Sequence, residues 1–253
     1  MQTETERIKR SYAKRSGQEF AERYSFLNPA VYMSVQERER ALLRWIRDSR
    51  IAPLASRRLI EIGCGSGQNL LDLLRFGFQP ENMVGNELLP ERVEAARRRL
   101  PPALSIVQGD ATQLDIPEES FDVVFQSTVF SSILEANFQR ALAARMWRWV
   151  APGGGVLWYD FIYNNPRNPD VAGVPLRRIR ELFPDGDLRY WRLTLAPPLA
   201  RLVTRVHPAL YNVVNAMPFL RTHVICWIRK EQRSALHREK LPGGSKNTAP
   251  LKP

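Results

Sequence analysis

The chain has 253 residues, of which 44% are hydrophobic and 25% are charged. This composition is typical of a globular protein, and the length suits one α/β domain with some additional segments. The N-terminal residues are charged and no apolar run reaches membrane-spanning length, so neither a signal peptide nor a membrane helix is predicted. The two cysteines, Cys64 and Cys226, form no disulfide framework and no zinc ligand set. We therefore expect a cytoplasmic protein without a metal site.

The charge is strongly positive, with 37 basic residues against 26 acidic residues and a net charge of +11. Such a surface attracts anions, including nucleic acid, acidic lipid and phosphorylated substrates. An arginine-rich composition produces the same excess without any anionic partner, and much of the excess lies near the two ends of the chain. The charge alone does not choose between these interpretations.

Residues 1–50 are predicted to be helical, with an amphipathic helix over residues 35–46 that opens at Ser34. Apolar strands and helices then alternate. Strands are predicted at residues 58–62, 83–87, 104–107, 121–125 and 156–161, helices at 70–74 (ended by Gly77), 90–100 and 136–150, and a turn at 152–155. This alternation predicts an α/β fold with a mostly parallel sheet that is covered by helices on both faces.

The pattern changes after residue 164. Two further strands are expected at residues 188–195 and 222–229, with an apolar segment of mixed helical character at 200–220 between them. The predicted organisation is a helical lid at 1–50, a main domain at 51–230 with an insertion at 196–220, and a disordered tail at 231–253.

A glycine-rich segment follows the first predicted strand and opens a helix. It reads Glu61-Ile-Gly63-Cys-Gly65-Ser-Gly67. Glycines let the backbone turn sharply and approach a ligand closely, and the amides at the start of the helix can face that ligand. A nicotinamide dehydrogenase would need Gly-x-Gly-x-x-Gly, whereas the spacing here is Gly-x-Gly-x-Gly and no pyrophosphate clamp is evident.

Two acidic residues end the next two predicted strands. Glu87 follows Gly67 by twenty residues and can accept both hydroxyls of a ribose. Asp110 ends the third strand and can accept a hydrogen bond from an adenine amino group. Because open α/β sheets bind ligands beyond the carboxyl ends of their strands, these features predict a nucleoside-containing cofactor.

With these motifs the sequence resembles the class I S-adenosylmethionine-dependent methyltransferases, especially the small-molecule group typified by the ubiquinone and menaquinone methyltransferases. The resemblance covers residues 59–160. It rests on Leu-Ile-Glu-Ile-Gly-Cys-Gly-Ser-Gly at 59–67, Val-Gly-Asn-Glu at 84–87, Gln-Gly-Asp-Ala at 108–111, Ile-Pro-Glu-Glu-Ser-Phe-Asp-Val-Val-Phe at 116–125 and Val-Ala-Pro-Gly-Gly at 150–154. One departure is Glu87, where the group more often has Asp.

The resemblance implies S-adenosyl-L-methionine as the cofactor. It also implies a Rossmann-like, doubly wound sheet of seven strands with an antiparallel last strand. Glu61 and the glycines are expected at the methionine end, Glu87 at the ribose, and Asp110 with Ala111 at the adenine. The full expected cofactor set is Glu61, Gly63, Cys64, Gly65, Gly67, Glu87, Leu88, Asp110, Ala111 and Gln126.

Methyl transfer is an in-line displacement on an activated carbon, so much of the catalysis can be positioning. A hydroxyl acceptor would still benefit from a general base. The candidates near the relevant strand ends are Asp160, Tyr163 and His223. For His223 the alternative, a packing residue of the last hairpin, is the favoured interpretation.

Three functions fit these observations: methyl transfer to a small molecule such as a sugar, a lipid-linked intermediate or a quinone; methyl transfer to nucleic acid; or a non-catalytic cofactor-binding subunit. The Asn/Asp-Pro-Pro-aromatic motif of base methyltransferases is replaced by Gln126-Ser-Thr-Val-Phe, which makes nucleic acid the weaker option. The sequence leaves the oligomeric state open.

Two segments are expected to form the acceptor site. One is the lid, with residues 12–24, Asn28 and Tyr32. The other is the segment at 200–220, where Arg201 and Arg205 flank apolar side chains. This segment suggests an apolar or anionic acceptor and peripheral contact with the inner face of a membrane. The alternative is an extra helix that packs on the sheet.

Overall fold

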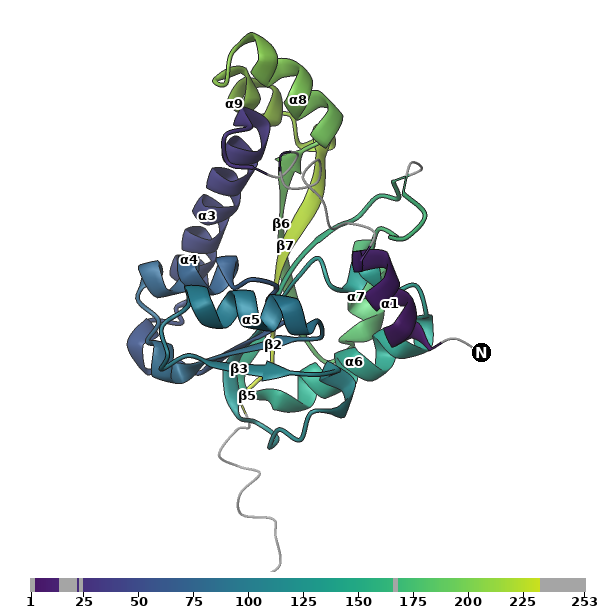
Figure 1. Cartoon of the computed structure of the whole chain (residues 1–253). Helices are drawn as coiled ribbons and strands as arrows, with labels where there is room; N and C mark the ends of the chain where they lie inside the picture. The colour runs from purple at the N-terminus through teal and green to yellow at the C-terminus, as the bar shows by residue number, and fades with distance from the viewer. Residues whose placement is uncertain (1–2, 14–21, 23–24, 166–167, 233–253) are drawn as a thin grey trace, which may run out of the picture.

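The computed structural model describes residues 3–13, 22, 25–165 and 168–232 (Figure 1). Seven strands form one sheet in the order β3-β2-β1-β4-β5-β7-β6. The strands are β1 (Leu59–Ile62), β2 (Met83–Glu87), β3 (Ser105–Gln108), β4 (Phe121–Ser127), β5 (Val150–Phe161), β6 (Asp187–Leu195) and β7 (Arg221–Arg229). Strands β1 to β5 pair in parallel, and β7 pairs antiparallel with β5 and with β6. The predicted doubly wound sheet with an antiparallel last strand is confirmed.

Helices cover both faces of this sheet (Figure 1). They are α1 (Glu4–Ala13), α3 (Pro29–Ser49), α4 (Gln68–Phe76), α5 (Pro90–Arg99), α6 (Ala136–Trp149), α7 (Leu176–Leu182), α8 (Pro197–Val206) and α9 (Leu210–Asn215). Side chains of α3, α4 and α5 pack on one face, and side chains of α6 and α7 pack on the other. With both faces covered, β1 is buried along its whole length, as its uninterrupted Leu-Ile-Glu-Ile sequence favours.

The long helix α3 begins earlier than Ser34, so the predicted start is wrong. Asn28 is the N-cap, and its side-chain oxygen accepts a hydrogen bond from the Ala30 amide at 3.1 Å. Pro29 occupies the first helical position, where a missing N–H costs nothing. Ser34 lies inside the helix and donates its hydroxyl to the carbonyl of Ala30. The Asn-Pro pair therefore sets the start of the helix, and Ser34 is accommodated within it.

The predicted turn at residues 152–155 is also wrong, because this segment belongs to β5. A Cβ on Gly154 would lie 2.5 Å from the carbonyl oxygen of Asp122, and a Cβ on Gly155 would lie 2.7 Å from that of Ile228. Glycine is needed here because two neighbouring backbones approach the strand closely, not because the chain reverses direction.

The segment between β6 and β7 forms α8 and α9. They pack against the start of α3 and the end of β6 in a third apolar cluster, composed of Ala30, Met33, Leu195, Ala200 and Tyr211. Figure 1 shows this unit at one end of the molecule, beyond the ends of β6 and β7. Most of the predicted tail, residues 233–253, lies outside the described residues, and so do residues 14–21 and 23–24 of the segment 12–24 that was expected at the acceptor site.

Candidate functional site

The loop between β1 and α4 has three glycines in left-handed backbone conformations. The φ angles are +65° at Gly63, +57° at Gly65 and +85° at Gly67. A Cβ on Gly63 would lie 2.6 Å from Val129, and one on Gly67 would lie 2.6 Å from Leu100. A Cβ on Gly65 would meet no atom within 4 Å. Two of the glycines thus serve packing, whereas Gly65 borders open space that a ligand could occupy.

Glu61 lies one residue before the end of β1, close to this loop, and is fully buried. Its Oε1 accepts a hydrogen bond from Asn69 Nδ2 at 2.6 Å, while its Oε2 has no partner among the described residues. Burial raises the pKa of Glu61 to about 8. A buried oxygen without a partner is unfavourable, and a cationic group of a ligand would satisfy it.

Arg38 of α3 reaches the same region and was not identified from the sequence. Its Nη2 lies 3.9 Å from Asp72 Oδ2 of α4, and its guanidinium lies 5.5 Å from the centroid of the Tyr159 ring. The Nε of Arg38 and the Oδ2 of Asp72 are buried without a hydrogen-bond partner in the described part of the chain. A signal was present, because Arg38 shares a helical stripe with the buried residues Leu42 and Trp45.

Glu87, at the end of β2, connects the glycine loop to the sheet. Its Oε2 accepts a hydrogen bond from the Gly65 amide at 2.8 Å, and its Oε1 accepts from the amides of Leu88 and Leu89 at 2.8 and 2.9 Å. The structure therefore brings the predicted ribose acceptor next to the glycine that borders open space. Leu88, also predicted to contact the cofactor, contributes its backbone amide to this arrangement.

Asp110 and Ala111 follow β3, with Ala111 buried at the start of a short 3-10 helix (Ala111–Gln113). The Asp110 Oδ1 accepts from the Thr112 amide and hydroxyl, at 2.9 and 2.8 Å. Its Oδ2 accepts from the hydroxyl of Thr5 in α1 at 2.8 Å. The N-terminal helix thus covers the predicted adenine acceptor.

Tyr12 belongs to the predicted lid segment 12–24, lies in α1 and contacts residues of two other elements. Its ring lies under the guanidinium of Arg92 at 4.3 Å, and its hydroxyl is 3.1 Å from the hydroxyl of Ser132. Asn28 and Tyr32 lie at the start of α3 instead, where Asn28 is the N-cap and Tyr32 is exposed.

Gln126 and Cys64 are engaged by the protein itself. The Gln126 side chain is fully buried, accepts from the Val129 amide at 3.0 Å and donates to the Tyr159 carbonyl at 3.4 Å. Cys64 is buried, and burial raises the pKa of its thiol, so it is a small packing residue and not a reactive one. A cofactor contact by either side chain stays a prediction.

Asp160 lies in β5 and is fully buried. Its carboxylate accepts hydrogen bonds from the amides of Ser131 and Phe161 at 3.1 and 3.0 Å. Burial raises the pKa of Asp160 to about 7, so the carboxyl can exchange a proton near neutral pH. Through its bond from the Ser131 amide, Asp160 also holds the segment that follows β4. Its role as a base stays a prediction.

His223 and Tyr163 occupy different environments. The His223 ring stacks on Tyr159 with centroids 5.3 Å apart, and burial lowers the pKa of the imidazole to about 4. The ring is therefore neutral at pH 7 and a weak base. Tyr163 is half-exposed, and its hydroxyl accepts from Arg192 Nη1 at 3.4 Å. The described geometry brings neither residue to the glycine loop.

The site thus lies at the carboxyl ends of parallel strands. It lies where the strand order reverses, because β2 and β3 follow on one side of β1 and β4 and β5 follow on the other. The methyltransferase-domain family matches residues 60–158, which contain the glycine loop, Glu87 and Asp110. Residues 60–158 therefore form a class I S-adenosylmethionine-dependent methyltransferase domain.

Curated relatives of this chain include enzymes named for lipid and quinone substrates. It is 36% identical over 163 residues to a fatty-acid O-methyltransferase of Mycolicibacterium smegmatis, covering 63% of this chain and 58% of that protein. It is 34% identical over 132 residues to a phthiotriol/phenolphthiotriol dimycocerosates methyltransferase of Mycobacterium ulcerans, covering 51% and 47%. It is 29% identical over 146 residues to the demethylmenaquinone methyltransferase of Deinococcus radiodurans, covering 56% of each. The chain spans about half the length of these relatives.

Solved structures share the fold of this chain. A putative sarcosine dimethylglycine methyltransferase of Galdieria sulphuraria has a TM-score of 0.56 at 14% identity, with 76% of this chain and 85% of that chain covered. The [4+2]-cyclase SpnF has a TM-score of 0.55 at 16% identity, with 77% and 82% covered. The fold is therefore found in proteins named for different reactions, and the reaction has to be argued from the site.

S-adenosylmethionine, the cofactor of the family, fits the residues at this site. The partnerless Oε2 of Glu61 matches the ammonium of its methionine end, and the guanidinium of Arg38 matches the carboxylate. The open space at Gly65 allows close approach of the ligand to the backbone. Glu87 lies beside that space and would accept the ribose hydroxyls.

Replacing Glu87 with alanine is expected to weaken S-adenosylhomocysteine binding by roughly 1.5–3 kcal/mol, because ribose hydroxyls would lose a charged acceptor. Isothermal titration measures the change. The variant should also melt at a lower temperature, since three backbone amides lose their acceptor. Glu87→Gln, which keeps one acceptor oxygen, should fall between the two proteins. Unchanged affinity in folded Glu87→Ala would place the ribose elsewhere.

Proposed function

We propose that this protein transfers a methyl group from S-adenosylmethionine to an apolar, lipid-like small molecule, with a hydroxyl or an anionic group as the polar part of the acceptor. The observation that carries the methyl-donor assignment is the fully buried Glu61, whose free carboxylate oxygen lies next to a glycine loop with open space at Gly65. When bound, the cofactor supplies a methyl group on a positively charged sulfur. The protein then has to orient the donor and the acceptor and to exclude water.

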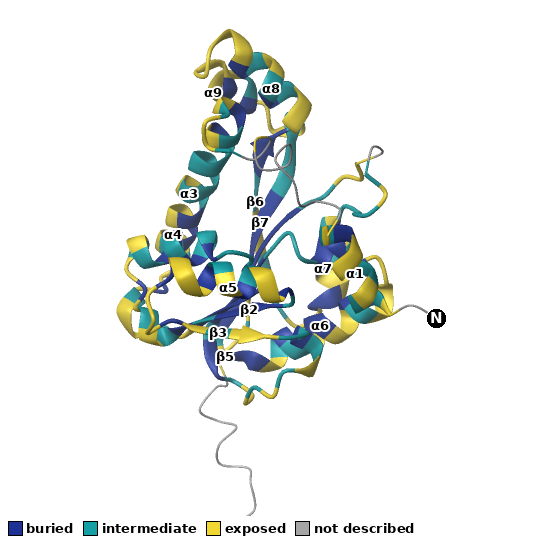
Figure 2. Ribbon diagram, viewed as in Figure 1, coloured by how far each residue is buried: buried dark blue, intermediate teal, exposed yellow. Residues whose placement is uncertain are grey.

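The acceptor class is supported by an exposed apolar surface on α8, on α9 and on the short 3-10 helix (Pro218–Leu220) that follows α9. We call it the apolar cap, and its members are Leu202, Val206, Val213, Met217 and Phe219. Val206 is 78% exposed and Phe219 is 71% exposed. Figure 2 shows exposed positions along both helices at the end of the molecule. Contiguous exposed apolar side chains mark binding or membrane surfaces more often than ordinary solvent-facing ones.

The inner side of the same unit anchors it to the fold. Ala200 and Thr204 of α8 and Tyr211 of α9 are buried, so each helix has one face on the protein and one face outward. None of the helices in the described part of the chain is both long and apolar enough to cross a membrane. Shallow contact of the apolar cap with a membrane surface is consistent with this arrangement. The lipid and quinone names of the relatives also favour a small molecule over nucleic acid.

The proposed activity can be tested with purified protein, a methyl-labelled donor and a lipid extract. The expected result is label in an organic-soluble product, absent from a parallel reaction with Gly65→Val protein. A set of acceptors with a hydroxyl, a carboxyl or no polar group would then identify the methylated atom. A separate reaction would contain RNA in place of the lipid extract. Label that appears only in that RNA, or in no product although the donor binds, would contradict the proposal.

Replacing Arg201 and Arg205 with glutamine is expected to leave cofactor affinity unchanged but to reduce liposome association and methyl transfer. The two arginines lie four residues apart on α8 beside the apolar cap. Their loss should lower partition onto acidic vesicles by on the order of tenfold, since each charge near the surface contributes attraction. Sedimentation with vesicles measures the change.

The matched control is Arg98→Gln with Arg140→Gln, which removes two exposed helical arginines from α5 and α6. This pair should change partition much less. Equal behaviour of both pairs would mean that α8 is a packing element and that general charge governs adsorption.

A further inference from the structure

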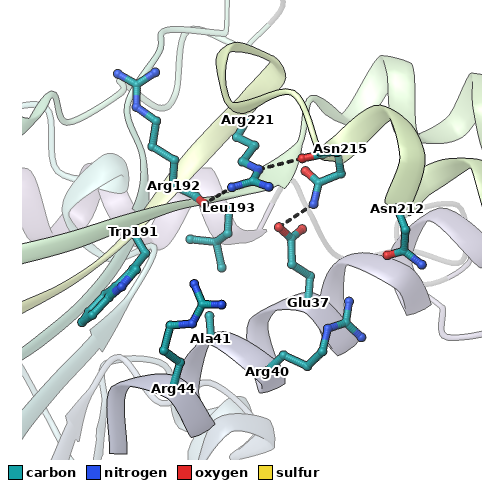
Figure 3. A pocket seen from close by; sticks show the side chains of 11 residues that line it. Glu37, Arg40, Ala41, Arg44, Trp191, Arg192, Leu193, Asn212, Asn215 and Arg221 are labelled. Carbon is teal, nitrogen blue, oxygen red and sulfur yellow. Dashed lines mark hydrogen bonds between the residues drawn. The ribbon is translucent and has the colours of Figure 1, made fainter. Parts of the chain in front are cut away.

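A second pocket lies between α3, β6 and α9, outside the glycine-loop site (Figure 3). It has a volume of about 390 Å³. We call it the arginine pocket; its polar and aromatic lining includes Arg40, Arg44, Trp191, Arg192, Asn212 and Arg221. Four arginines line this pocket, and none of them belongs to the residues expected to bind the cofactor.

The spacing of residues on α3 creates one wall of the pocket. Glu37, Arg40, Ala41 and Arg44 lie at positions i, i+3, i+4 and i+7, which share one stripe of a helix. All four line the pocket. Ala41 is the small residue in the middle of this stripe, so the longer side chains around it surround a hollow.

Glu37, the only carboxylate among the residues that line the pocket, is fully engaged by the fold. Its Oε2 accepts from the Thr194 amide at 2.9 Å and from the Tyr211 hydroxyl at 2.8 Å. Its Oε1 accepts from Asn215 Nδ2 at 2.7 Å. These bonds join α3, β6 and α9. Glu37 therefore holds the walls of the pocket together and makes no ion pair with its arginines within the described structure.

The four arginines also have no ion-pair partner elsewhere in the described ranges. Arg221 is held in place by neutral groups, because its Nε donates to the Asn215 carbonyl at 2.8 Å and its Nη1 donates to the Arg192 carbonyl at 3.1 Å. Figure 3 shows Arg44 and Arg221 reaching into the space between α3 and β6 from opposite sides. Like charges that converge without a counter-charge repel each other, and an anion in the pocket would relieve this repulsion.

We propose that the arginine pocket binds a phosphate group. The planar guanidinium fork matches phosphate oxygens with paired hydrogen bonds, and Arg44 and Arg221, which reach into the pocket from opposite sides, can contact one anion together. The pocket shares α9 with the apolar cap: Asn212 and Asn215 face the pocket, while Val213 is 66% exposed. A phosphate bound there lies beside an apolar surface, which suits the headgroup of a phospholipid as well as a free phosphorylated metabolite. The site does not depend on methyl transfer.

The test uses the double variant Arg40→Gln/Arg44→Gln, whose two residues are exposed on α3 and make no ion pair in the described structure, so that the fold should persist. Arg98→Gln/Arg140→Gln is the matched control, with the same loss of charge on other helices. A third variant, Ala41→Leu, fills the hollow without changing any charge. Unchanged S-adenosylhomocysteine affinity and melting temperature would verify that each protein is folded.

Two probes distinguish the source of the phosphate. Isothermal titration with inorganic pyrophosphate and with glycerol 3-phosphate reports recognition of a soluble group. Sedimentation with phosphatidylcholine vesicles, with or without phosphatidic acid, reports recognition of a headgroup. We expect wild-type protein to bind at least one of these probes, the pocket variants to bind it about tenfold or more weakly, and the charge control to stay within about threefold of wild type.

Loss with the soluble probes would identify a metabolite phosphate, and loss with the acidic vesicles alone would identify a lipid headgroup. Equal weakening in the pocket and control variants would show adsorption by general charge and overturn the proposal. Absence of wild-type binding to both probes would overturn it as well. Because no readout involves methyl transfer, these outcomes are independent of the proposed activity.

Discussion

Replacing Gly65 with valine is expected to abolish S-adenosylhomocysteine binding in a protein that still folds. The φ angle of +57° costs a branched residue strain of about 1–2 kcal/mol, which is small against a typical total stability of about 5–15 kcal/mol. The added side chain enters the open space beside the loop, where it would collide with the donor. Affinity should fall on the order of 100-fold or more, as measured by isothermal titration.

Gly77→Val is the control for backbone strain. Gly77 also has a positive φ, +112°, and a Cβ there would also meet nothing within 4 Å. It lies at the C-terminal cap of α4, away from the proposed ligand. This variant should lose stability but keep its affinity for the donor. Retained binding in Gly65→Val, or equal loss in both variants, would contradict the placement of the cofactor.

Cofactor affinity is expected to increase with pH on the order of tenfold per unit from about pH 6 to about pH 7.5. Burial raises the pKa of Glu61 to about 8, so this carboxyl is protonated at neutral pH in the ligand-free protein. An ammonium group favours the ionised form, so binding should release a proton. Titrations in buffers with different ionisation enthalpies would detect that proton. Glu61→Gln should bind more weakly and without this pH dependence.

The same carboxyl affects the stability of the ligand-free protein in the opposite direction. Its folded pKa lies above its ordinary value of 4.5, so its contribution is fully present below about pH 4.5 and is lost as the pH rises through about 8. The difference in unfolding free energy between wild type and Glu61→Gln should therefore shift against wild type across this window. A difference that is constant with pH would show that Glu61 is ionised in the free protein.

Much of the fold could be predicted because the parallel strands are buried on both faces and appear as short apolar runs. The bounds of β2 match its predicted range, and α4 ends at Gly77 as expected. The start of α3 was missed because the Asn28-Pro29 pair outweighs Ser34, and both are plausible helix starts. The glycines at 153–155 predict a turn, but a strand that neighbouring strands approach closely requires glycine too, and the sequence does not distinguish the two cases.

The predicted donor residues come together because parallel strands end at one edge of the sheet. Residues whose partners depend on helix packing are harder to predict from the sequence. Arg38 reaches Asp72 and Tyr159 only because α3 lies across the sheet. Glu37 hydrogen-bonds Thr194 and Tyr211, which lie 157 and 174 positions further along the chain. No local pattern predicts such contacts.

The hydrogen bonds already present at the donor site determine which parts of the ligand can contribute net affinity. Asp110 Oδ2 accepts one hydrogen bond from Thr5, and Glu87 accepts three from amides, so adenine and ribose would meet acceptors that are already partly satisfied and held in place. Acceptors that are held in place select the correct donor geometry in the ligand. Glu61 Oε2 has no bond to give up. With the cofactor placed as proposed, donor recognition would be asymmetric: a group that binds Glu61 would satisfy an orphaned atom, whereas the nucleoside would add hydrogen bonds to acceptors that the fold has already oriented.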